Sequence, residues 1–170
     1  MPSTPPAPRV ILGIDPGSQI TGVGVIEVLG QRLKYRHAAS IKLGSAELNT
    51  RLKTLYRELN SVIETHKPDL VAVERVFIAK NPHSALVLGH ARGAAILAAV
   101  NADVDIVEYS ATEIKKTVVG RGRADKTQVQ HMMRILLGLR AAPEADAADA
   151  LAAAVCHAHH MQAQRLVKQV

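Results

Sequence analysis

The stretch from Val10 to Glu27 limits the fold of this chain more than any other segment. Its first part, residues 10–14, is an almost unbroken apolar run, which is typical of a central strand covered on both faces. The run ends at Asp15, and a Pro-Gly-Ser turn then leads into a second apolar segment at residues 22–26. A carboxylate at the end of a buried strand costs free energy unless positive charge holds it, so the sequence predicts a positively charged partner for Asp15.

The order of the other apolar segments predicts an α/β fold. The expected strands cover residues 10–14, 22–26, 32–43, 69–74 and 104–107, and the expected helices begin at residues 45, 81, 110, 125 and 145. The first three strands follow one another through short turns, as in an antiparallel meander. Each later strand is reached through a helix, and such a strand normally lies parallel to one already in the sheet. We therefore expect one mixed sheet, with three antiparallel strands and then two parallel ones, flanked by helices on both faces.

The length and composition indicate a single globular domain. We expect it over residues 9–163, between a Pro-rich, disordered tail at residues 1–8 and a polar tail at residues 164–170. No apolar run reaches the length of a membrane span, and Cys156 is the only cysteine. These features favour a cytoplasmic protein without membrane contact. Lys and Arg outnumber Asp and Glu by 21 to 15, and the resulting charge of +6 favours a polyanionic partner.

Four acidic residues predict a metal site. Asp15 and Glu74 each end an apolar strand, and Asp146 and Asp149 share one face of the last helix. Each has a simpler explanation on its own, as a turn residue, a solvated strand end or a complement to the helix dipole. Sites in parallel sheets form at the carboxyl ends of strands, however, and four carboxylates gathered there would repel one another without cations. Hard oxygen ligands select Mg²⁺ or Mn²⁺, and two ions about 4 Å apart would clamp an in-line phosphoryl displacement.

The chain resembles the RuvC family of Holliday-junction resolvases over about residues 10–160. The segments that carry the resemblance, in order, are GIDPGSQITGVGVIE, AVERVFIAKNPHSALVLGHARGAA, TVVGRGRADKTQVQHM and EADAADALAAA. The resemblance implies a ribonuclease H-like fold and a homodimer that acts on four-way DNA junctions. It also implies that the acidic quartet of the family falls on the four carboxylates named above, although some relatives carry His at the position of Asp146.

The same resemblance implies the chemistry. We expect a Mg²⁺-dependent endodeoxyribonuclease with two Mg²⁺ per subunit, for which Mn²⁺ substitutes. It would make two symmetric nicks in strands of like polarity, leaving 5′-phosphate and 3′-hydroxyl ends that ligase can seal, in DNA recombination and repair. A RuvAB-type branch-migration motor is the further partner that the family implies.

Other side chains are candidates for contacts to DNA. Phe77 follows Glu74 by three residues in an expected loop; a core position is the usual explanation for a Phe, but stacking on an unpaired base is worth roughly 1–3 kcal/mol. Lys115 and Lys126 match family lysines that are linked to catalysis, and one of them could neutralise charge in the transition state. A solvated basic face is the usual explanation for the remaining group, which we expect to contact the DNA backbone. This group consists of Arg75, Lys80, Lys116, Arg121 and Arg123.

Three histidines crowd the last helix at positions 157, 159 and 160. They suggest zinc, but nothing supplies a fourth ligand at the spacing of a zinc site. One of them could still tune the metal site near Asp149 or relay protons, whereas Cys156 has the character of a small core residue.

Three other functions compete with the nuclease. An ATP-binding protein of the actin and sugar-kinase type would need a second lobe, for which 170 residues are too few. A junction-binding module without catalysis would not need the acidic quartet, and a ribonuclease H acting on RNA–DNA hybrids is separated from a resolvase only by the family resemblance. The sequence leaves open the cleavage preference, the general base and the contact surface for the motor. The small-residue helix over residues 81–100 is the expected dimer interface.

Overall fold

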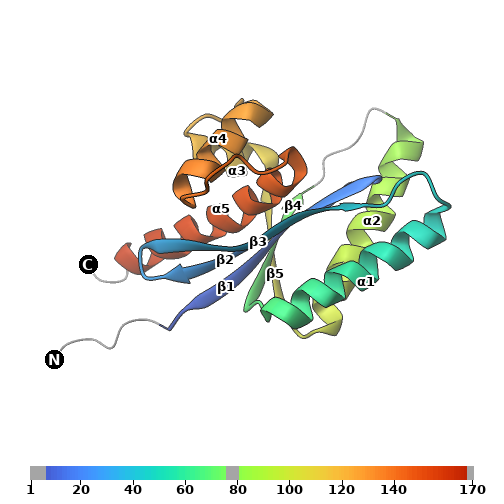
Figure 1. Ribbon diagram of the computed structural model, residues 1–170, viewed down its shortest axis with the longest axis horizontal. Helices are drawn as coiled ribbons and strands as arrows, with labels where there is room; N and C mark the ends of the chain where they lie inside the picture. The colour runs from blue at the N-terminus through green and yellow to red at the C-terminus, as the bar shows by residue number, and fades with distance from the viewer. Residues whose placement is uncertain (1–6, 76–80, 168–170) are drawn as a thin grey trace.

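A five-stranded mixed sheet with helices on both faces forms the centre of the molecule in the computed structural model, which describes residues 7–75 and 81–167 (Figure 1). The elements are β1 (Arg9–Asp15), β2 (Ile20–Leu29), β3 (Arg32–Lys42), α1 (Leu48–His66), β4 (Leu70–Arg75), α2 (Pro82–Asn101), β5 (Asp105–Ser110), α3 (Ala111–Val119), α4 (Lys126–Leu136) and α5 (Ala145–Val167). The strand order is β3-β2-β1-β4-β5. β1, β2 and β3 pair antiparallel, and β4 and β5 join in parallel, which confirms the predicted fold class.

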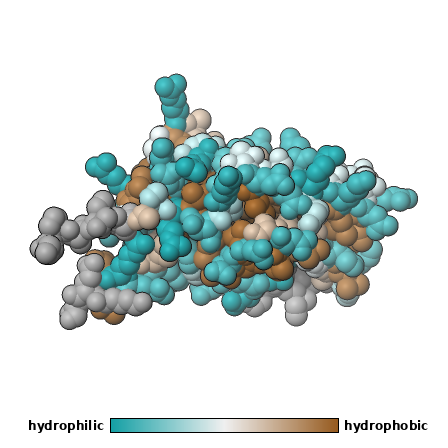
Figure 2. Space-filling model, turned by 90° about the horizontal axis from the view of Figure 1, so that it is seen from below, coloured by the Kyte–Doolittle hydropathy of each residue, from teal (hydrophilic) through white to brown (hydrophobic). Residues whose placement is uncertain are grey.

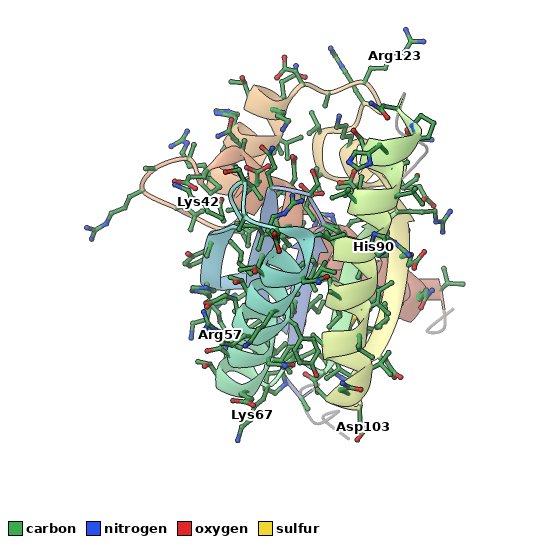
Figure 3. The ribbon with its side chains drawn as sticks, turned by 90° about the vertical axis from the view of Figure 1, so that its right-hand side faces the viewer. Lys42, Arg57, Lys67, His90, Asp103 and Arg123 are labelled. Carbon is green, nitrogen blue, oxygen red and sulfur yellow. The ribbon has the colours of Figure 1, made fainter. Side chains whose placement is uncertain are left out.

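The central strands are buried on both sides because two apolar layers cover the sheet. α1 and α2 lie side by side over one face, where Leu55 and Leu59 of α1 pack against Leu12 and Ile14 of β1 (Figure 3). The opposite face is covered by α3, α4 and α5 and holds the second core, to which β1 contributes Ile11. The apolar run at residues 10–14 therefore lies in a central strand that is covered on both faces, as predicted.

The helix starts follow the local capping chemistry. The Asn81 side chain accepts a hydrogen bond from the backbone N–H of His83, and capping boxes begin α3 at Ser110 and α4 at Asp125, as predicted. The predicted start of α1 at Ser45 is wrong. Gly44 adopts a φ of +65°, and the helix begins only at Leu48, without a side-chain cap. A residue with a left-handed backbone just before Ser45 directs the chain away from the helix.

Several strand and helix ends differ from the expected ones. β2 and β5 extend beyond the predicted ranges 22–26 and 104–107, since their flanking residues continue the ladders with β1, β3 and β4. α5 continues to Val167, past residue 164, where the polar tail was expected to begin.

Close packing between α5 and the sheet sets the position of the site. A Cβ atom at Gly13 would lie 1.9 Å from the carbonyl oxygen of Ala150, and one at Gly22 would lie 1.9 Å from that of Asp146. At Gly24 the nearest atom of Leu151 would be 2.7 Å away. These three glycines are paired neighbours or near neighbours on β1 and β2, so they form a bare strip of sheet. The Ala-rich start of α5 can approach the strands only because the strip carries no side chains.

Candidate active site

Asp15 and Glu74 end two neighbouring parallel strands. β1 and β4 pair in register as far as Ile14 and Val73, so the next residue on each strand is the acid. Asp15 lies two residues after Gly13, and its side chain therefore points to the same face as the strip that receives α5. Both carboxylates face the helix that carries Asp146 and Asp149.

The pKa of Asp15 shows that this carboxylate lies within electrostatic range of the other three. Burial raises the pKa of Asp15 to about 8, and the negative charges of Glu74, Asp149 and Asp146 add to the effect in that order. The positive charge of Lys126 acts in the opposite direction. The structure thus brings carboxylates from three separate elements within electrostatic range of one another, and burial together with their mutual repulsion favours the protonated form of Asp15.

The two lysines that the sequence analysis singled out also lie within range of the acidic groups. Burial is the main cause of the raised pKa of Glu74, followed by the charge of Asp149, whereas Lys115 and Lys126 act to lower it. The pKa of Asp149 is likewise raised by burial and opposed by Lys126 and Lys115. α3 and α4 therefore supply positive charge to the same pocket of carboxylates.

The oxygen ligands of the candidate site fit a hard divalent cation, because all of them belong to carboxylates. Such a cation would also cancel the repulsion between their negative charges. Among the described residues, no three His, Cys, Asp or Glu side chains lie close enough to hold a metal ion as they stand. Cation binding would therefore have to draw the carboxylates together. Asp15 and Glu74 on the strands, with Asp146 and Asp149 on α5, are the residues that would hold it.

A short loop connects Asp15 to β2, and two contacts fix it. The Thr21 hydroxyl bonds both the backbone N–H and the carbonyl of Gly17, each at 3.3 Å. From α1, the Arg51 guanidinium donates to the carbonyl of Ser18 at 2.8 Å. Sequence analysis missed Arg51, because nothing in the α1 pattern separates it from other surface basic residues. Thr21 was detectable in principle, as a hydroxyl that follows a Pro-Gly-Ser turn.

The expected DNA-binding residues separate into groups. Arg121 and Arg123 are exposed in the turn between α3 and α4, and Lys116 is exposed on α3. Figure 3 shows Arg123 and Lys67 at opposite ends of the molecule. β1 and β4 finish towards the end that carries Arg123.

Arg75 lies elsewhere. It follows Glu74 on β4 and therefore points to the opposite face of the sheet, where its Nε is 3.7 Å from a carboxylate oxygen of Glu108. Glu108 also binds Arg92 of α2. The side chain of Arg75 is therefore directed away from the four carboxylates of the candidate site. Phe77 and Lys80 lie outside the described residues.

The histidine cluster is not part of the acidic site. His157 Nδ1 lies 2.8 Å from the hydroxyl of Tyr109, and the ring of His160 meets that of Tyr109 edge to face. Burial lowers the pKa of His157, so its neutral form is favoured as a hydrogen-bond partner. None of the groups that shift the pKa of Asp149 is a histidine. The cluster packs α5 against β5.

The chain is similar to known proteins over most of its length. Residues 11–157 match the family model described as "Crossover junction endodeoxyribonuclease RuvC". The proteins of that name from Shewanella sediminis and Shewanella pealeana are 54% and 56% identical over 153 residues, which is 90% of this chain and 88% of each relative. A solved structure titled "T. thermophilus RuvC in complex with Holliday junction substrate" superimposes with a TM-score of 0.85 at 33% identity, covering 92% of this chain and 96% of the other.

Proposed function

Because this chain belongs to the RuvC family of crossover junction endodeoxyribonucleases, we propose that it resolves four-way DNA junctions by hydrolysing one phosphodiester bond in each of two strands of like polarity. The products would be 5′-phosphate and 3′-hydroxyl ends. The observation that carries the proposal is the electrostatic coupling of Asp15 to three other carboxylates: burial raises its pKa to about 8, and the charges of Glu74, Asp149 and Asp146 add to the effect. The register of β1 and β4, which brings Asp15 and Glu74 to neighbouring strand ends, supports this proposal, and α5 contributes Asp146 and Asp149.

We assign the four carboxylates to Mg²⁺ binding, with two ions per subunit and Mn²⁺ as a substitute. When bound there, Mg²⁺ would supply the positive charge that activates a water molecule for attack and stabilises the leaving oxygen of an in-line displacement. Lys115 and Lys126 add charge at the same place, since both act on the pKa of Glu74 and Asp149. Their role in the reaction is to stabilise the extra negative charge on the phosphate in the transition state.

The basic turn between α3 and α4 would hold the DNA backbone beside the carboxylates. Arg121 and Arg123 are exposed in this turn, Lys116 is exposed on the preceding α3, and all three can reach phosphates. Phe77 and Lys80 stay predictions as DNA contacts. We keep Arg75 as a weaker candidate, because Glu108 already neutralises part of its charge.

α2 supports the proposal that the enzyme works as a dimer. Its exposed residues Leu86, Gly89, Gly93, Leu97 and Val100 fall at spacings of three and four and so share one face. A Cβ atom at either glycine would meet no other atom within 4 Å, which leaves room for another helix to approach.

By length and composition, α2 is also the one helix in the described part of the chain that could cross a membrane, with 22% of the window buried. A second copy of this chain is the better explanation. Two equivalent sites related by a two-fold axis match the two-fold symmetry of a four-way junction. In the view of Figure 2, apolar surface is visible near the middle and towards both ends of the molecule, interspersed with hydrophilic side chains. A branch-migration motor in a cytoplasmic repair pathway is the further partner that the family suggests.

A cleavage assay on a synthetic four-way junction tests the function. The protein should nick two strands in Mg²⁺ and none in EDTA, and it should leave linear duplex intact. Asp15→Asn should reduce the rate by at least about a thousandfold while leaving junction binding measurable, because it removes a charge from the cation site but none from the DNA-binding surface. Normal cleavage by this variant would refute the assignment of the carboxylates.

A further inference from the structure

β3 is an edge strand of the sheet, and β2 is the only strand that pairs with it among the described residues (Figure 1). The register of this pair shifts at Arg36, which has no partner on β2. From His37 to Lys42 the ladder is regular. Every second residue of this segment directs its backbone N–H and C=O groups away from β2. Residues 37–42 therefore offer a free edge on which another strand can pair.

The free edge has little of the protection that edge strands usually carry. Lys42 is its only Lys, Arg, Asp or Glu, and the segment contains no proline. The register shift at Arg36 lies before it. β5, the other edge strand, is six residues long, whereas β3 is eleven. The edge of β3 is thus long enough, and regular enough, to receive a partner strand.

Two grooves flank the free edge, one on each face of the sheet. The α5 groove has a volume of about 400 Å³ and is lined from β3 by Ala38, Ser40 and Lys42. The α1 groove has a volume of about 440 Å³ and is lined from β3 by His37, Ala39 and Ile41. Side chains of a strand alternate between the two faces of a sheet. A strand added beside β3 would therefore direct its own side chains alternately into the two grooves.

The charges around the free edge favour an acidic partner. β3 has no acidic residue and four basic ones, which are Arg32, Lys34, Arg36 and Lys42. Among the described residues, only Arg36 of this group has an acidic partner within 4 Å, namely Glu27 at 2.6 Å. Burial lowers the pKa of His66 in the α1 groove, and the positive charges of His37 and Arg36 act in the same direction. Positive charge is therefore in excess at this end of the groove.

The same charges argue against a second copy of the chain as the partner. Antiparallel pairing of two β3 strands would place basic side chains of one copy beside those of the other, and like charges opposite each other destabilise a sheet. The N-terminal tail is unsuited as well, because residues 1–8 contain four prolines and no acid. Opposite β3, the α1 groove holds Glu58 and the α5 groove holds Glu144, but these two acids do not balance four basic residues.

We propose that β3 docks an extended acidic segment of a partner protein, which joins the five-stranded sheet as a further strand beside residues 37–42. The main chain of this segment bonds to the free edge. Its apolar side chains enter the α1 groove between Ile41 and Val62, and acidic residues at its ends meet Arg36 and Lys42. The docking surface is separate from the carboxylate site and does not depend on the proposed nuclease function.

Selection from a phage-displayed library of short random peptides, in EDTA and without DNA, tests the proposal. The selected peptides should carry acidic residues at both ends of an alternating apolar segment. Fluorescence anisotropy of the most enriched peptide, synthesised with a label, measures its dissociation constant. Lys42→Glu should raise this constant by about threefold to tenfold, because it replaces attraction by repulsion. Lys53→Glu is the matched control, an exposed Lys on α1 outside both grooves, and should leave the constant unchanged.

Two N-methylated forms of the selected peptide test the strand geometry. One form carries methyl groups on every odd-numbered backbone amide, and the other carries them on every even-numbered one. Only one edge of an added strand faces β3. One form should therefore lose at least about tenfold in affinity, while the other keeps the affinity of the parent peptide.

Three results would overturn the proposal. If the selection enriches no acidic peptides, β3 is not a docking site for them. If the two methylated forms bind alike, the peptide does not pair as a strand, and equal binding at the parent affinity would mean that β3 attracts polyanions such as DNA by charge alone. If Lys42→Glu changes the association state in sedimentation equilibrium, a second copy of the chain occupies the edge. None of these measurements uses junction cleavage, so failure of the nuclease proposal would be seen separately.

Discussion

Among the described residues, Asp15 is the carboxylate whose pKa is raised furthest from its ordinary value. Its carboxylate lies at the end of a buried strand, and three other carboxylates surround it. Burial and repulsion raise its pKa from the ordinary value of 3.8 to about 8. Between these two values the folded protein binds a proton that the unfolded chain releases. The contribution of Asp15 to the free energy of unfolding should therefore fall as the pH rises from about 4 to about 8 in metal-free buffer.

Asp15→Asn should remove the contribution of Asp15 to this dependence and leave the contributions of Glu74 and Asp149, whose pKa values are also raised by burial. In EDTA at pH 8 the variant should melt at a higher temperature than the unaltered protein, and the difference should shrink towards pH 5, where Asp15 keeps its proton in the folded state. Mg²⁺ should stabilise the unaltered protein more than the variant, because the cation replaces the bound proton. Thermal unfolding followed by circular dichroism at several pH values measures both effects.

Asp103→Asn is the matched control for this experiment. Asp103 is exposed, has a φ of +55° that Asn tolerates, and lies at the far end of the molecule in Figure 3. Its pH profile should follow that of the unaltered protein. Equal melting temperatures for Asp15→Asn and the unaltered protein across this pH range would mean that the carboxylates are not coupled as described.

At the scale of elements, the site depends on how closely α5 approaches the sheet. The strip formed by Gly13, Gly22 and Gly24 lets the first turns of α5 rest on the backbone of β1 and β2. The position of Asp146 and Asp149 relative to Asp15 follows from that contact. A methyl group at any of the three glycines would push the helix away from the strands.

Gly22→Ala should therefore damage both stability and cleavage. Its Cβ would lie 1.9 Å from the carbonyl oxygen of Asp146, so the start of α5 must shift. We expect a loss of about 1–3 kcal/mol in the free energy of unfolding. Cleavage should fall by about a hundredfold, because a displacement of about 1 Å in a catalytic group has that effect. Urea denaturation and the junction assay measure the two losses.

Gly44→Asn is the control for Gly22→Ala. Gly44, like Gly22, has no side chain. A Cβ atom at Gly44 would meet nothing within 4 Å, however, and Asn tolerates its φ of +65°. This variant should retain normal cleavage. Cleavage by Gly22→Ala at the same rate as Gly44→Asn would show that α5 does not depend on the glycine strip.

The sequence predicted the elements better than their contacts. Apolar runs and caps identify β1, α3 and α4, since both signals are local. The start of α1 was misplaced, because the turn at Gly44 precedes it and no side chain marks its cap. Glycines within strands are a signal of close backbone approach, but only the fold shows which helix approaches.

For the site, too, the sequence predicted local features but not the contacts between distant segments. Period-two alternation places Glu74 and Arg75 on opposite faces of β4, so their separation was available from the sequence once the strand was assigned. The contact of Arg51 and the two grooves beside β3 depend on tertiary contacts between segments that are distant in the chain. Local patterns contain no information on such contacts.

At the scale of the whole molecule, one apolar face on α2 stays exposed among the residues that the structure describes. Leu86, Leu97 and Val100 are 65%, 50% and 54% exposed on α2, and Gly89 and Gly93 lie between them. A two-fold axis through this face would bring the same residues of two copies together. The dimer would then carry two acidic sites, one for each strand that is cut.

Leu97→Glu should separate the subunits. In a symmetric interface, the substitution places a charge on each helix near the axis, where both lose water and repel each other. A central interface residue is worth about 2 kcal/mol, so the dissociation constant should rise roughly thirtyfold. Sedimentation equilibrium measures this change. The junction assay should show single nicks replacing paired ones, because one subunit leaves before the second strand is cut.

Leu166→Glu separates this effect from a general effect of surface charge. Leu166 is 57% exposed near the end of α5, which is comparable to Leu97, but it lies away from the α2 face. This variant should stay dimeric and cut both strands. A monomeric Leu97→Glu protein that still makes paired nicks would show that the two cuts need no dimer, and the symmetry argument for junction resolution would then be lost.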